Sequence, residues 1–102
     1  MPVTRRAQLI VVASAVEGTA ERIAARLRED GAVAYATHSL KGCLRVATSL
    51  RPDIVVIDPA LPGRLERLLR AHPMSAHARF LYLTDDAAAP IGVERTAHLV
   101  AA

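Results

Sequence analysis

The sequence predicts an α/β fold in which a doubly wound parallel sheet carries helices on both faces. Short apolar runs rich in β-branched residues alternate along the chain with longer segments whose apolar residues recur at helical spacing. The connections between them are short, and right-handed crossovers make successive strands parallel. The chain offers about four strands, in the expected order 2-1-3-4, so the sheet is truncated relative to a five-stranded doubly wound domain.

Four segments are predicted to be strands. Leu9–Ala13 and Ile54–Ile57 are wholly apolar, as expected of central strands covered on both faces. Val33–Thr37 is half polar in its alternation, which suits an edge strand. Arg79–Thr84 is the fourth strand, and it lies at the opposite edge in the expected order.

Helices are predicted between the strands and after the last one. Thr19–Asp30 is followed by the stop signal Gly31, and the next helix begins after Ser39 and ends before Pro52. Arg64–Ala71 is a short amphipathic helix, and Ile91–Val100 is a weaker final one. The residues expected to face the core are Ala20, Ile23, Ala24 and Leu27, then Leu40, Cys43, Leu44, Ala47 and Leu50, then Leu65, Leu68 and Leu69.

Composition favours a single domain over residues 1–102 and argues against several function classes. The 13 basic residues are interleaved with 10 acidic ones and aromatic content is 3%, so a nucleic-acid partner is disfavoured. Cys43 stands alone, which excludes an internal disulfide and fits a reducing, cytoplasmic location. No stretch approaches the roughly 20 apolar residues of a membrane span, so no membrane partner is expected.

Asp58 is the main candidate for function. It follows the buried strand Ile54–Ile57, and the carboxyl end of a central parallel strand opens into the crevice where such sheets bind ligands. The alternative is structural, because an aspartate there also caps the following turn through backbone amides. The four histidines show no spacing typical of metal ligands; they are His38, His72, His77 and His98.

Three segments together resemble the receiver domain of two-component response regulators, the CheY-like domain with a flavodoxin-like fold, over about residues 7–86. They are Leu9-Ile-Val-Val, Pro52-Asp-Ile-Val-Val-Ile-Asp58-Pro-Ala-Leu-Pro-Gly63 and Phe80-Leu-Tyr-Leu-Thr84. The resemblance implies that Asp58 is the phospho-acceptor position and Thr84 the switch hydroxyl. It also implies an acidic pair that holds Mg²⁺, at the positions occupied here by Ala13 and Ser14.

The resemblance is incomplete in its chemical groups. The receiver's lysine at the end of a fifth strand has no counterpart, since the single lysine of the chain, Lys41, lies in the second predicted helix. A phosphoryl group on Asp58 would therefore lack both metal and lysine to compensate its charge. We expect a degenerate pseudo-receiver that is not an enzyme, with no catalytic residue, no metal and no cofactor.

The leading prediction is a phosphorylation-independent protein–protein interaction module in bacterial signal transduction or cellular organisation. The alternative is a phosphorylatable single-domain response regulator in which Asp58 accepts phosphate and Glu17 or Asp85 helps to hold Mg²⁺. The predicted partner is a protein, and a homodimer or other oligomer is expected because the fourth strand leaves an apolar edge. The residues of that interaction edge are Phe80, Leu81, Tyr82 and Leu83.

Overall fold

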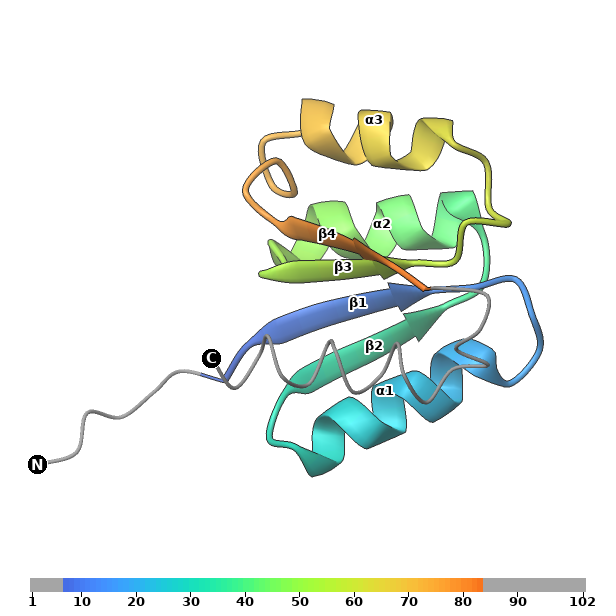
Figure 1. The fold of residues 1–102 in the computed structure, drawn as a ribbon. Coiled ribbons are helices and arrows are strands. Elements are labelled where there is room, and N and C mark those ends of the chain that lie inside the picture. Colours follow the sequence, from blue (N-terminus) through green and yellow to red (C-terminus); the bar gives the residue numbers. More distant parts are fainter. Residues whose placement is uncertain (1–6, 84–102) are drawn as a thin grey trace, which may run out of the picture.

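The computed structural model describes residues 7–83, in which strands and helices alternate as predicted (Figure 1). The strands are β1 (Leu9–Ala13), β2 (Val33–Thr37), β3 (Ile54–Ile57) and β4 (Arg79–Tyr82). The helices are α1 (Thr19–Glu29), α2 (Leu40–Leu50) and α3 (Arg64–Ala71). The predicted final helix, Ile91–Val100, lies outside the described residues.

The sheet has the predicted order β2-β1-β3-β4, and every pairing in it is parallel. Figure 1 shows α1 on one face of the sheet, and α2 and α3 together on the other. In the register of the central strands, Ala13 of β1 lies beside Thr37 of β2 and Ile57 of β3. The carboxyl ends of these three strands therefore meet at one edge of the sheet.

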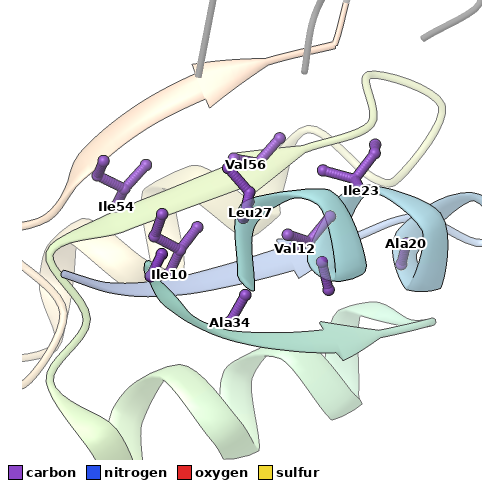
Figure 2. Close-up of a cluster of buried hydrophobic side chains, with 10 residues drawn as sticks. Ile10, Val12, Ala20, Ile23, Leu27, Ala34, Ile54 and Val56 are labelled. Carbon is purple, nitrogen blue, oxygen red and sulfur yellow. The ribbon is translucent and has the colours of Figure 1, made fainter. Parts of the chain in front are cut away.

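Alternation along β1 divides the core into two layers. Ile10 and Val12 point toward α1, whereas Val11 and Ala13 point toward α2 and α3, and all four are fully buried. Figure 2 shows the α1 layer, where Ile10, Val12, Ile54 and Val56 of the sheet face side chains of the helix. Each fully buried Val or Ile contributes about 1.5–3 kcal/mol relative to an exposed one, so burial of these central strands stabilises the fold strongly.

Local signals fix where α2 begins and ends. The Ser39 side chain accepts a hydrogen bond from the Gly42 amide at 2.9 Å, as predicted for the cap of this helix. A Cβ at Gly42 would lie 3.1 Å from the Ser39 side-chain oxygen, a tight contact. A larger residue at position 42 would therefore crowd the Ser39 cap. At the other end, Arg51 leaves the helix in a left-handed conformation with φ 55°, just before Pro52.

The predicted core faces were right for α1 and too broad for the other helices. Leu50 is 37% exposed and Leu68 is 40% exposed, although both were expected to face the core. Leu50 occupies the last position of α2, and α3 is an eight-residue helix that buries only Leu65 and Leu69. A short helix on a four-stranded sheet offers a narrow contact stripe, so the residue at its flank stays in solvent.

Two predicted boundaries differ slightly from the structure. Helix α1 ends at Glu29, and Asp30 serves as its C-terminal cap. Strand β4 ends at Tyr82 rather than at Thr84, although the Leu83 amide still donates to the Ile57 carbonyl at 3.0 Å. Hydrogen bonding to β3 thus continues one residue beyond the regular strand.

Candidate functional site

The parallel register of β1 and β3 brings Ser14 beside Asp58. Ala13 pairs with Ile57 in the sheet, so the next residue of each strand lies at the same level. The Asp58 amide donates to the Ala13 carbonyl at 2.9 Å, which extends the strand pairing to this point. The Asp58 carboxylate is therefore placed at the carboxyl end of the two central strands, where the sequence predicted the site.

Ser14 is a direct partner of the Asp58 carboxylate. Its hydroxyl donates to Asp58 Oδ2 at 2.8 Å and accepts a hydrogen bond from the Val16 amide at 3.2 Å. The Ser14 side chain is fully buried, whereas Asp58 is half-buried. A buried hydroxyl that donates to a charged oxygen makes one of the stronger hydrogen bonds of a protein, so it orients the carboxylate.

The second carboxylate oxygen of Asp58 accepts a hydrogen bond within the turn that follows β3. Asp58 Oδ1 accepts from the Ala60 amide at 2.9 Å, and the Asp58 carbonyl accepts from the Leu61 amide at 2.9 Å. These contacts form an Asx turn, the structural role that the sequence left open for this residue. Leu61 is buried, so the turn also anchors the loop to the core. Both carboxylate oxygens thus have protein donors.

The remaining residues predicted for phosphoryl chemistry are not gathered around Asp58 in the described part of the chain. Thr84 and Asp85 lie outside residues 7–83. Glu17 is exposed in the loop between β1 and α1. Within the described residues, no group of three or more His, Cys, Asp or Glu side chains is arranged to hold a metal ion.

The predicted interaction edge separates into side chains with different environments. Phe80, Leu81 and Leu83 are half-buried, because Phe80 packs on the α2–α3 layer while Leu81 and Leu83 pack on the α1 layer. Tyr82 is 45% exposed. The edge therefore exposes one aromatic side chain, and the prediction that it binds a partner stays a prediction.

A polar cluster joins α3 to β4. The Tyr82 hydroxyl donates to Glu66, whose carboxylate also pairs with Arg70 at 2.6 Å, and the Arg70 guanidinium lies 4.5 Å from the centre of the Phe80 ring. Hydrogen bonds from Tyr82 and then from Arg70 hold the pKa of Glu66 below its ordinary value. Burial, followed by the hydrogen bond to Glu66, raises the pKa of Tyr82 to about 12.

Cys43 lies in the core, and the described histidines lie on the surface or in a turn. Cys43 is fully buried, and this burial raises the pKa of its thiol to about 11, so the nucleophilic thiolate is not formed near neutral pH. His38 contacts Glu21 on the surface, and His72 Nδ1 accepts from the Met74 amide at 3.1 Å. His77 is exposed. His98 lies outside the described residues.

The sequence reasoning missed two partnerships in this region. The resemblance to a receiver marks Ser14 only as the replacement of an acidic residue, although the parallel register of the two predicted strands places it level with Asp58. The register of these two strands was the feature from which the contact between Ser14 and Asp58 could have been predicted. The pairing of Glu66 with Tyr82 joins residues on different elements, and no pattern in the sequence indicates it.

Comparison with known proteins bears on the fold. The solved solution structure of the N-terminal receiver domain of NtrC superposes with a TM-score of 0.52 over 93% of this chain and 97% of that one. The chain has the fold of a receiver domain. The sequence identity is 21%, so this likeness concerns the fold alone.

The other comparisons give no match, either with known protein families or with curated proteins. Within residues 7–83 no helix is long and apolar enough to cross a membrane. The similarity to a receiver domain therefore rests on the fold.

Proposed function

We propose that this chain is a pseudo-receiver, a non-enzymatic module that binds protein partners in bacterial signal transduction or cellular organisation without phosphorylation. The single observation that carries the proposal is the hydrogen bond from Ser14 to Asp58 Oδ2. In the receiver pattern an acid at that place helps to hold Mg²⁺. A serine supplies a donor to the carboxylate instead, which satisfies Asp58 without a metal.

The neighbouring position supports the same proposal. Ala13 occupies the other place of the acidic pair and is fully buried in the core layer that also contains Cys43 and Leu65. An ionised side chain there would lose its hydration among apolar neighbours, at a cost of several kcal/mol. The surroundings of this position therefore suit a small apolar residue and disfavour a metal-binding carboxylate. This supports a domain that binds partners without phosphorylation.

The second candidate function is a phosphorylatable response regulator, favoured by the half-exposure of Asp58. With a small acyl phosphate as the donor, one Asp58 oxygen would form a bond to phosphorus while the bond from phosphorus to the acyl oxygen of the donor breaks. The donor leaves as a carboxylate. Under this alternative, Asp58 together with Glu17 or Asp85 would hold Mg²⁺, which would compensate the negative charge of the transferred group.

Amide NMR of the full chain with Mg²⁺ and beryllofluoride separates the two candidates. The pseudo-receiver is expected to show no saturable shift of the Ser14, Asp58 and Ala60 amides. Saturable shifts that centre on these residues and disappear in Asp58→Asn would refute it. Ser14→Asp is the matched comparison, because it restores a carboxylate beside Asp58 and is expected to increase Mg²⁺ affinity.

A further inference from the structure

The fold separates charges that are interleaved along the sequence. Helix α1 with its C-terminal cap Asp30 contains three acidic and three basic residues and lies on one face of the sheet (Figure 1). Helices α2 and α3 lie together on the other face. With Arg51, the cap of α2, these helices contain one acidic residue, Glu66, and six basic residues: Lys41, Arg45, Arg51, Arg64, Arg67 and Arg70. These six residues define the α2–α3 surface.

The positive charge of the α2–α3 surface is exposed. All six basic residues are exposed, and within residues 7–83 only Arg70 pairs with a carboxylate, that of Glu66. Asp53 and Asp58 are half-buried at the two ends of β3, where their carboxylates accept hydrogen bonds from residues at the two ends of β1. These two acids belong to the sheet and not to the helices. The α2–α3 surface therefore has a net positive charge that attracts an acidic partner.

An exposed leucine lies among these basic side chains. Helix α2 packs on β1 and β2, so α3 has α2 on one flank and the β4 edge on the other. Glu66 is on the β4 flank of α3, because Tyr82 of β4 donates a hydrogen bond to it. Leu68 follows two residues later, about 200° around the helix, and so lies on the flank beside α2. Since Leu68 is 40% exposed, it adds an apolar contact between the basic side chains of the two helices.

The composition of this surface distinguishes between several kinds of acidic partner. Five of its six basic residues are arginines, whose planar guanidinium makes two-point contacts with carboxylates and phosphates. The aromatic residues of the chain lie on strands, so α2 and α3 offer no ring on which nucleic-acid bases could stack. A membrane-surface helix inserts a wide apolar face, whereas α2 and α3 turn theirs toward the core. Exposed arginine beside an apolar residue is instead typical of protein interfaces.

We propose that the α2–α3 surface binds an amphipathic acidic helix of a partner protein. Leu68 contacts the apolar stripe of that helix, and the carboxylates beside the stripe pair with Lys41 and Arg45 of α2 and with Arg64 and Arg67 of α3. A nucleic-acid backbone would place phosphates against Leu68, whereas an amphipathic protein helix covers this side chain with an apolar one.

This inference rests on the proposed function and gives the surface and the chemistry of its protein partner. Asp58 lies at the carboxyl end of β3 and is not part of the α2–α3 surface. Partner binding is therefore read from amides of α2 and α3, and the beryllofluoride experiment from amides around Asp58. Failure of one prediction leaves the other unchanged.

Amide NMR titration of the full chain with a synthetic acidic peptide tests the proposal. The peptide repeats Leu-Glu-Glu-Leu over about three helical turns, so that its leucines form one stripe with glutamates beside it. Saturable shifts are expected at the amides of α2 and α3 and not at those of α1. A peptide that repeats Leu-Lys-Lys-Leu has the same apolar stripe with the opposite charge, and it is expected not to bind.

Charge reversal identifies the binding surface. Arg64→Glu/Arg67→Glu is expected to weaken binding of the acidic peptide about tenfold. Glutamate is favourable in the first turn of a helix, so this variant should fold. Arg22→Glu/Arg26→Glu is the matched control, because it changes the net charge equally at exposed positions of α1, and it should bind like wild type.

Leu68→Ser and two phosphate-bearing probes separate a protein partner from other acidic partners. Leu68→Ser is expected to weaken peptide binding, because the apolar contact is lost while all six basic residues remain. A DNA duplex and phosphatidylserine vesicles are expected to bind the wild type more weakly than the acidic peptide does. No saturable shift on α2 and α3, a control variant as weak as Arg64→Glu/Arg67→Glu, or tighter binding to DNA or vesicles would each overturn the proposal.

Discussion

The Ser14 hydroxyl and the Ala60 amide together bind both oxygens of the Asp58 carboxylate. Replacing Ser14 with Ala removes one donor from a half-buried charge and leaves that oxygen without its protein partner. We expect the free energy of unfolding to fall by about 1–2 kcal/mol, as measured by urea denaturation. The decrease in unfolding free energy caused by Ser14→Ala should be smaller in an Asp58→Asn background. A urea midpoint that Ser14→Ala leaves unchanged would show that the hydrogen bond does not stabilise the fold.

Tyr82 and Glu66 form a pair whose contribution to stability depends on pH in two directions. The pKa of Tyr82 is raised to about 12 from 10.0, so its contribution is complete below pH 10 and is lost as the pH rises through about 12. The pKa of Glu66 is lowered from 4.5, so its contribution is present above that pH and is lost as the pH falls.

Ultraviolet titration of tyrosinate measures the alkaline part of this prediction. One phenol of the wild type should titrate near pH 12, and this late transition should be missing in Tyr82→Phe. Glu66→Gln is the paired variant, because it keeps an acceptor but removes the negative charge, and it should move the Tyr82 transition to lower pH. A wild-type curve that Glu66→Gln leaves unaltered would contradict the pairing.

The end of α2 contains a residue in an unfavourable conformation. Arg51 has φ 55°, a region that costs a residue with a Cβ about 1–2 kcal/mol relative to glycine. Arg51→Gly relieves this strain but also increases the entropy of the unfolded chain. The net expectation is stabilisation by about 0.5–1 kcal/mol in thermal or urea unfolding. Destabilisation would mean that contacts of the Arg51 side chain outweigh the backbone strain.

Elements with a local cause were predictable from the sequence. β1, β2, β3 and α3 were predicted with the bounds that the structure shows, because β-branched runs, apolar periodicity and flanking proline act within a few residues. The contact of Arg28 with the Ala34 carbonyl was not predictable, since it depends on how far α1 extends over the edge strand. Side-chain pairs of this kind follow from packing rather than from local sequence.

Removing Arg28 should change how whole molecules associate. In Arg28→Ala the Ala34 carbonyl at the β2 edge loses its guanidinium donor, so this edge becomes suited to strand addition. Strand addition at the uncovered edge joins molecules to one another, so we expect light scattering to show larger species than in the wild type. Arg26→Ala, an exposed position on the same helix, is the control. A size distribution equal to that of the control would show that Arg28 does not protect the edge.

For the molecule as a whole, the sequence predicted the sheet order, and the structure confirms it. Asp58 lies at the carboxyl end of β3, and its role as a functional site stays a prediction. The chemistry at that place was harder to predict, because it depends on hydrogen bonds across the sheet. The sequence shows that Ser14 replaces a carboxylate of the receiver pattern. Its role as the hydrogen-bond donor to Asp58 becomes apparent only from the register of β1 against β3. A shared fold at 21% identity therefore does not establish a shared reaction.

The central claim is that Asp58 is held as a structural carboxylate and is not phosphorylated. Its most direct test is intact-mass spectrometry of the full chain after incubation with Mg²⁺ and a small acyl phosphate, beside Asp58→Asn as the blank. We predict identical, unmodified mass for the two proteins apart from the substitution itself. The gain of one phosphoryl group by the wild type alone would contradict the claim.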